Sequence, residues 1–317
     1  MMAVLAYIEN CPASKGLIPS MQPDQYTGFD QVRRIEQEVP HDDLKRPQSA
    51  PSSSFTRILE IFDLFSPDKM TVNVDEIVSL YGIGLSTGYR YMRELCEKGF
   101  LTQLGKGSYS LGPRIVELER IVELNDPVLG AGRRVMEGLD RQTTNATFML
   151  CTFYKDRVLC IHQVGDDRIK YGSEVLRLVR GRGTPLPLFQ GAGSLAILAN
   201  LAPTQIKSLY MTNQALISEH GLARDWVGFR KQMLQIRKAG FAMTSGQINE
   251  KLVGLAVPFF AGDGPAVGSL LMVTASTDDG RESAKSTLPT LLLKAAEIGA
   301  ELAPTPAADI VAARAMA

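Results

Sequence analysis

The 317-residue sequence predicts a two-domain α+β protein. Its length exceeds that of one typical domain. In residues 54–112 the hydrophobic period changes from that of helices to that of strands. In residues 127–303, pairs of apolar strand-like runs have helical segments before, between and after them. Such an alternation is typical of an antiparallel sheet flanked by helices.

Composition narrows the class of protein. Hydrophobic residues make up 45% of the chain and charged residues 21%, as in ordinary globular proteins. No apolar run approaches the roughly 18–20 residues that span a bilayer. The start of the chain also lacks the basic segment of a signal peptide. We therefore expect a cytoplasmic protein without a membrane partner.

The cysteines and histidines do not form a metal motif. No two of the four cysteines are spaced Cys-x-x-Cys, and the three histidines lie far apart in the sequence. Cys96, Cys151 and Cys160 are expected as small buried apolar residues instead. No group of residues resembles a catalytic set. We expect neither a metal, nor a cofactor, nor enzymatic activity.

The two ends of the chain carry no motif. Residues 1–53 are rich in proline and in charges of both signs. This composition predicts either a disordered arm or an over-long gene start. Residues 304–317 are expected to form a flexible tail.

The first two helices are expected directly after this arm. Isoleucine and phenylalanine recur at helical spacing over residues 54–66. In the next pattern, Asn73 and Glu76 stand three residues apart and predict a capping box. Gly82 then ends the second helix.

A third helix and a hairpin complete the first domain. The helix is expected to begin at Ser86 and to stop at Gly99. Two short runs of period two, residues 100–104 and 108–111, flank a Gly-Lys-Gly turn and predict a β-hairpin. Three helices followed by a hairpin are the order of a winged helix-turn-helix, here residues 54–112.

The second half begins with a linker helix over residues 113–126, since Pro113 suits a first helical turn. Further helices are expected over residues 127–142, 191–200, 224–239 and 285–302. Strands are expected over residues 147–154, 157–164, 240–245, 252–260 and 266–276.

The third helix of the first domain carries the candidate DNA-reading surface, because a helix-turn-helix places its second helix in the major groove. One stripe of this helix is expected to pack inward: Gly88, Tyr91 or Met92, Leu95 and Cys96. The opposite stripe and the hairpin tip carry side chains that suit bases and phosphates. The candidate DNA-binding residues are Ser86, Thr87, Tyr89, Arg90, Arg93 and Lys106.

Charge alone does not identify a nucleic-acid partner. The chain has a formal net charge of +0, and residues 54–125 hold more acidic than basic side chains. An arginine pair on a helix is also usually a solvated face. However, basic residues outnumber acidic ones between Arg90 and Arg114, so the reading surface is locally positive. A winged helix that contacts protein rather than DNA is the alternative.

Several strings resemble the IclR family of bacterial transcriptional regulators over residues 54–303. They are Ser86-Thr87-x-x-Arg90, Lys98-Gly99-Phe100-Leu101, Gly191-Ala192-Gly193 and Gly254-Leu255-Ala256-Val257-Pro258. The resemblance implies a winged helix-turn-helix, a linker helix and an effector domain of GAF-like shape. It also implies homodimers or homotetramers that bind near-palindromic double-stranded DNA operators. One departure is Gly88, where relatives usually carry an apolar residue. Close helix packing or a flexible reading helix would explain it.

The resemblance further implies a pocket for a small organic effector. Relatives that bind small organic acids line this pocket with an aspartate, a cysteine and two serines. Ungapped spacing puts Thr244, Gly254, Leu271 and Val273 at these places, and Gln247 at the place of a signature glutamate. The candidate effector-binding residues are Gly191, Ala192, Thr244, Leu252, Gly254, Leu271 and Val273.

These departures change the expected effector. A pocket with few polar groups cannot offset the desolvation of a small, strongly hydrated acid. We expect a larger, more apolar effector, such as an aromatic compound, that controls a catabolic operon. Alternatively, Leu271 and Val273 fill the cavity, and ligand binding is altered or lost. Three arginines precede the Gly191 segment, and one of them pointing inward would suit an aromatic acid. They are Arg177, Arg180 and Arg182.

Overall fold

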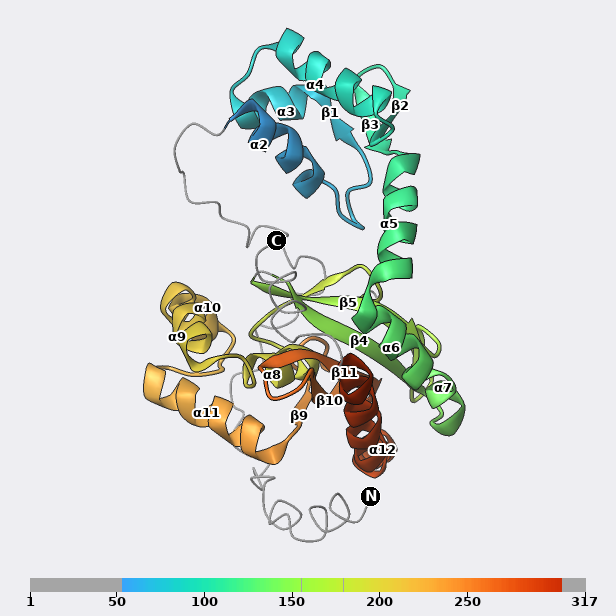
Figure 1. Ribbon diagram of the computed structural model, residues 1–317, viewed down its shortest axis with the longest axis vertical. Coiled ribbons are helices and arrows are strands. Elements are labelled where there is room, and N and C mark those ends of the chain that lie inside the picture. Colours follow the sequence, from blue (N-terminus) through green and yellow to red (C-terminus); the bar gives the residue numbers. More distant parts are fainter. Residues whose placement is uncertain (1–52, 155, 179, 304–317) are drawn as a thin grey trace. The chain divides into compact units, whose positions relative to one another are not determined.

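The computed structural model describes residues 53–154, 156–178 and 180–303 (Figure 1). The chain forms two compact units that divide between Ile121 and Val122. The expected arm and tail lie outside the described residues, apart from Ser53. The Ser53 side chain caps the first helix by accepting a hydrogen bond from the Thr56 N–H.

Within its described residues, the first unit combines helices with a three-stranded antiparallel sheet of order β1-β3-β2. Its elements are α2 (Ser54–Glu60), the 3-10 helix η5 (Ile61–Leu64), β1 (Val72–Asn73), α3 (Val74–Tyr81), α4 (Leu85–Glu97), β2 (Leu101–Gly105) and β3 (Ser108–Leu111). α5 (Pro113–Asn125) follows the hairpin. Ile61, Ile77 and Met92 are buried together in one core. The predicted winged helix-turn-helix is confirmed, and β1 adds an unpredicted third strand.

Three local expectations in this unit are wrong. The first helix tightens to the 3-10 form at Ile61 instead of continuing. The capping box does not form, because none of the described backbone N–H groups donates to the Asn73 side chain. Glu76 pairs with Lys69 instead. α4 begins one residue earlier than predicted, with Gly84 as its N-cap.

Within the described residues, the second unit is built on a six-stranded antiparallel sheet of order β8-β5-β4-β11-β10-β9. The strands are β4 (Ala146–Tyr154), β5 (Arg157–Val164), β8 (Pro185–Leu186), β9 (Ala242–Ser245), β10 (Leu252–Phe260) and β11 (Ala266–Ala275). β6 (Arg168–Tyr171) and β7 (Glu174–Arg177) form a separate pair. The helices are α6 (Pro127–Met136), α7 (Leu139–Gln142), α8 (Ala192–Leu198), α9 (Pro203–Thr212), α10 (Gln214–Glu219), α11 (Trp226–Ala239) and α12 (Asp278–Leu302).

The two faces of this sheet are buried in separate cores. Leu270 and Met272 of β11 belong to the core formed with α6 and α12. Leu271 belongs to the core that contains the alanine, leucine and isoleucine side chains of α8. Neighbouring side chains of β11 thus enter opposite cores, as expected for a strand in a sheet covered by helices on both faces (Figure 1). The predicted α+β class, with an antiparallel sheet flanked by helices, is therefore confirmed.

The helices of this unit differ from the predicted ones in three places. Gly138, at φ 79°, ends the predicted helix over residues 127–142 early and separates α6 from α7. α9 and α10 occupy a stretch for which no helix was predicted. α12 begins at Asp278 rather than near residue 285, because the Thr277 hydroxyl accepts a hydrogen bond from the Gly280 N–H.

The substitution Gly268→Ala is expected to destabilise the second unit by about 1–3 kcal/mol, as overpacking does. A Cβ here would lie 2.2 Å from the backbone oxygen of Cys151 and 2.4 Å from the Phe259 ring. β11 and β4 would therefore have to separate. Denaturant unfolding followed by circular dichroism measures the change.

The matched control is Gly130→Ala in α6, where the new methyl group meets only the Arg134 guanidinium at 3.6 Å. It should leave stability unchanged or raise it by up to about 1 kcal/mol. Equal losses from both substitutions would contradict the close approach of β11 to β4.

Candidate functional site

The inner stripe of α4 holds the helix tightly against α3. Gly88, Tyr91, Met92 and Leu95 are buried, as the helical spacing predicts, whereas Cys96, expected on the same stripe, is only half-buried. A Cβ on Gly88 would lie 2.9 Å from Cγ2 of Val78 on α3. Close helix packing therefore explains this glycine.

The outer stripe of α4 faces solvent next to the hairpin. Arg90 and Arg93 are exposed, and Tyr89 is 45% exposed. The Tyr89 hydroxyl lies 3.8 Å from the Cβ position of Gly107 in the hairpin turn. The exposed Lys106 precedes that glycine. The structure thus brings the middle of α4 and the hairpin tip together.

The basic side chains on this surface differ in whether they form ion pairs. Arg93 has only a long contact, Nε to Oε1 of Glu97 at 3.9 Å, and both side chains are mostly exposed. Such a pair contributes little to stability. Among the described residues, no carboxylate forms an ion pair with Arg90 or Lys106. Ser86 is exposed and Thr87 half-buried in the first turn of the helix.

In the second unit, the start of α8 is fixed by a loop that follows β9. Gly191 has φ 79° and precedes the helix as its N-cap. Its N–H donates to Oε1 of Gln247 at 2.9 Å. A Cβ on Gly191 would lie 2.6 Å from Cδ1 of Ile248. Gln247, at the place of the signature glutamate, therefore still supplies an acceptor oxygen.

Five of the seven candidate effector-binding residues form one group, centred on Gly254 of β10. Its Cβ position lies 3.3 Å from Cβ of Ala192, 3.4 Å from Oγ1 of Thr244 and 3.5 Å from Cδ1 of Leu271. Val273 is paired with Gly254 across the sheet. Neighbouring strands and the first turn of α8 thus place these residues together.

The other two candidates lie at the edges of this group. Gly191 directly precedes Ala192 and contacts Ile248. Leu252 is half-buried at the start of β10.

Leu271 fills the space between the sheet and α8. Its side chain is buried, with Cδ2 3.2 Å from the Cβ position of Gly193. The same glycine position lies 3.6 Å from Sγ of Cys151 on β4. An effector in this region would therefore contact or displace Leu271.

The three arginines that precede α8 have different surroundings. Arg177 pairs with Asp167 at 3.0 Å, and Arg182 donates to the Ile161 carbonyl and to Glu123. Arg180 is half-buried, and burial lowers the pKa of its guanidinium. None of the described residues accepts a hydrogen bond from Arg180 or forms an ion pair with it.

Arg180 directly precedes Gly181, and Gly181 lies at one end of a row of paired residues across the sheet that includes Leu271. The Cβ position of Gly181 is 2.7 Å from Oε1 of Gln163. Gln163 is paired with Met149, and Met149 is paired with Leu271.

A carboxylate that was not predicted connects the end of α5 with segments around the six-stranded sheet. Glu123 is only 12% exposed and binds both Arg133 of α6 and Arg182, the latter at 2.9 Å. Burial, followed by the charges of these two arginines, lowers the pKa of the nearby His162. Nothing in the local sequence distinguishes Glu123 from the other glutamates of the helix.

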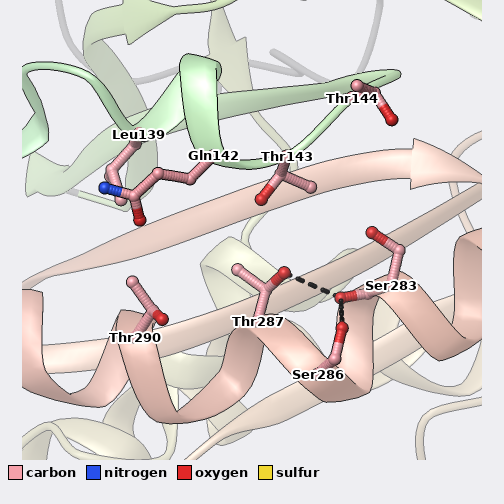
Figure 2. A pocket seen from close by; sticks show the side chains of 8 residues that line it. All are labelled: Leu139, Gln142, Thr143, Thr144, Ser283, Ser286, Thr287 and Thr290. Carbon is pink, nitrogen blue, oxygen red and sulfur yellow. Dashed lines mark hydrogen bonds between the residues drawn. The ribbon is translucent and has the colours of Figure 1, made fainter.

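A cavity lies between α7 and α12 (Figure 2). It has a volume of about 290 Å³ and is lined mostly by hydroxyl groups. The Ser286 and Thr287 hydroxyls donate to the Ser283 carbonyl of their own helix. None of the candidate effector-binding residues lines this cavity.

The part of the chain that the structure describes contains no cluster of three or more histidine, cysteine or acidic side chains placed to hold a metal ion. Nor does it contain a helix long and apolar enough to cross a membrane.

The fold and these surfaces define a winged helix-turn-helix protein with a C-terminal sensor domain of GAF-like shape. The profile of the family described as "Bacterial transcriptional regulator IclR C-terminal" matches residues 125–298, more than half of the chain. The chain belongs to the IclR family of bacterial transcriptional regulators.

Individual relatives agree with this assignment. The HTH-type transcriptional regulator KipR of Bacillus subtilis is 22% identical over 192 residues, which cover 61% of this chain and 74% of the relative. An IclR transcriptional regulator from Alicyclobacillus acidocaldarius superimposes with a TM-score of 0.62 at 19% identity, covering 80% of this chain and 99% of that one.

A further structure is an IclR homologue from Microbacterium hydrocarbonoxydans in complex with 4-hydroxybenzoate. It has a TM-score of 0.60 at 18% identity and covers 80% of this chain and 100% of that one. At these identities the structural likeness establishes the fold. The relatives are regulators rather than enzymes.

The substitution Glu123→Ala is expected to destabilise the second unit by about 1–3 kcal/mol, because it leaves two partly buried guanidinium groups without their shared carboxylate. Thermal and denaturant unfolding measure the loss. The matched control is Glu174→Ala, which removes an exposed carboxylate paired with Lys251. It should cost less than about 0.5 kcal/mol. Equal effects would show that the Glu123 cluster contributes no more than a surface ion pair.

Proposed function

We propose that this protein is a sequence-specific DNA-binding regulator that controls a catabolic operon in response to a small organic effector. The observation that carries the proposal is the exposed outer stripe of α4 beside the hairpin tip. There, Arg90 and Lys106 have no carboxylate partner among the described residues. Two copies in a homodimer, or four in a homotetramer, would present paired reading helices to a near-palindromic operator.

Each part of this surface has a chemical role in the proposal. The guanidinium groups of Arg90 and Arg93 would bind guanine edges or phosphates in the major groove. Ser86 and Thr87 lie in the first turn of α4, where free N–H groups favour a phosphate. Tyr89 and Lys106 would contact the flanking backbone. Effector binding would change the separation of the two reading helices and hence operator affinity.

Arg90→Ala and Arg93→Ala are each expected to weaken operator binding by about 1–3 kcal/mol. The operator is first recovered by sequencing the genomic DNA that the purified protein retains. Fluorescence anisotropy with that duplex, at two salt concentrations, then gives the affinities. A steep fall of affinity with salt is expected from phosphate contacts.

Arg224→Ala is the matched control, since it removes an exposed arginine from the second unit. It should change operator affinity by less than about 0.5 kcal/mol. Unchanged affinity in both α4 variants would exclude these arginines from the interface. Sequence-blind or absent DNA retention with a flat salt response would favour the alternative that the winged helix contacts protein.

The proposed effector is an aromatic carboxylate. Gly254, Leu271 and Val273 give the candidate site an apolar character that suits a ring. Arg180 is a half-buried cation without a partner among the described residues, so a carboxylate would offset its desolvation. The 4-hydroxybenzoate bound by the Microbacterium hydrocarbonoxydans relative belongs to this chemical class. The competing hypothesis is that Leu271 and Val273 fill the site and abolish binding.

Arg180→Leu is expected to raise the Kd for an aromatic carboxylate by roughly 10–100-fold, the loss of one charged hydrogen bond. Isothermal titration of the full chain with a series of benzoates, 4-hydroxybenzoate included, measures this change. The alcohol analogue 4-hydroxybenzyl alcohol should bind both proteins alike. Binding of benzoates that Arg180→Leu leaves unchanged would contradict the role of Arg180. If no benzoate binds the unaltered protein but one binds Leu271→Ala, the filled-site hypothesis is correct.

A further inference from the structure

Two cysteines face each other on neighbouring strands beneath α8. Cys151 on β4 and Cys160 on β5 are partners in the antiparallel register, directly after the shift in register between Leu150 and Cys151. Both belong to the core on the α8 side of the sheet, so both side chains lie on one face. Directly opposed residues of antiparallel strands have Cα atoms about 4.5–5.5 Å apart. A disulfide requires a Cα–Cα distance of about 4.4–6.8 Å. The spacing of paired strands falls within this range.

The two thiols also interact with each other. The hydrogen bond between them raises the pKa of the Cys151 thiol well above its usual value, and burial adds to this rise. The same hydrogen bond lowers the pKa of Cys160; burial opposes this effect, and the His162 backbone and the charge of Arg182 add to it. In the structure, Sγ of Cys160 donates to the His162 carbonyl at 3.4 Å. Cys160 is therefore the more acidic thiol of the pair, and the one expected to supply the nucleophilic thiolate when it loses its proton.

The position of the pair connects it with the candidate effector site. Sγ of Cys151 lies 3.6 Å from the Cβ position of Gly193, which also contacts Leu271. Ser269, opposite Cys151 on β11, donates from Oγ to the Gly193 carbonyl at 2.8 Å. A covalent change at Cys151 would therefore act on α8 and on the side chain that fills the site.

The pair lies nearer to the β8-β5 edge of the sheet than to the β9 edge. Both cysteines are buried, so an oxidant must be small and must enter during local opening. Within the described chain, β8 pairs with β5 only at Val158 and Leu159. Beyond these two residues, the Gly183 N–H donates to the Cys160 carbonyl from a loop. This edge is therefore held by fewer strand hydrogen bonds than the centre of the sheet.

We propose that Cys151 and Cys160 form a peroxide-sensitive thiol pair that closes a disulfide between β4 and β5. The Cys160 thiolate attacks one oxygen of hydrogen peroxide, the O–O bond breaks, and the released hydroxide takes up a proton to leave as water. Cys160 becomes a sulfenic acid. The Cys151 thiol then attacks the Cys160 sulfur, and a second water leaves as the S–S bond forms. Overall, two thiols are oxidised and one peroxide is reduced to two waters. The proposal does not depend on the identity of the effector.

The test uses the full chain with Cys11→Ser and Cys96→Ser, so that only the pair remains. After treatment with hydrogen peroxide under native conditions, the number of free thiols is expected to fall from two to none and to recover with dithiothreitol. Trypsin cuts after Lys155 and Arg157, between the two cysteines. Non-reducing mass spectrometry should therefore find residues 142–155 joined to residues 158–168.

Single-cysteine variants of this protein identify the attacking sulfur. With Cys151→Ser, whose hydroxyl can still donate a hydrogen bond, Cys160 should form a sulfenic acid that dimedone traps. With Cys160→Ser, Cys151 should react at least tenfold more slowly. Equal rates would overturn the assignment of Cys160.

Two free thiols after oxidation, or separate sulfinic acids in place of the joined peptides, would overturn the proposed disulfide. If a substituted protein does not fold, the same peptide mapping on the unaltered chain decides between these outcomes.

Discussion

α8 lies against the sheet at the distance set by its smallest residues, and the geometry of the sensor domain depends on this contact. Ala192 and Gly193 on the helix meet Gly254 and Leu271 on the strands at Cβ positions only 3.2–3.3 Å from the nearest carbon. At this separation an added methyl group on the glycines has no free volume. The contact fixes where α8 starts, where Leu271 can lie and how near Cys151 comes to the helix. A larger side chain between α8 and the sheet would shift the start of α8, the Leu271 side chain and the distance from Cys151 to the helix together.

On the opposite face of the sheet, the second unit also contains a carboxylate that is mostly buried and pairs with two arginines. Glu123, near the end of α5, binds Arg133 of α6 and Arg182 of the loop that leads to α8. The last turn of α5 is therefore tied both to α6 and to the loop that precedes α8. A displacement of the loop next to α8 would alter the partners of this turn. Such a shared partner is a physical means of coupling two sites.

The sequence predicted the elements whose pattern is local and regular. The buried stripe of α4, the hairpin and the strands of the sheet follow from periodicity. Family spacing located Thr244, Leu271 and Val273, which meet at Gly254. Other features depend on partners that are distant in sequence. Glu123 binds side chains 10 and 59 residues away. Glu76 pairs with Lys69 and is therefore not available to form the capping box. α9 and α10 are short helices that tertiary packing stabilises.

The contact between Gly254 and Leu271 has a consequence for how such sites diverge. At these two places, the family resemblance implies a cysteine and a serine. Here one position has lost its side chain and the other has gained a larger one, and Cδ1 of Leu271 lies 3.5 Å from the missing Cβ. Either change alone would leave a void or a clash. The two positions should therefore covary among homologues, and their evolution should be epistatic: each residue is acceptable only in the presence of the other.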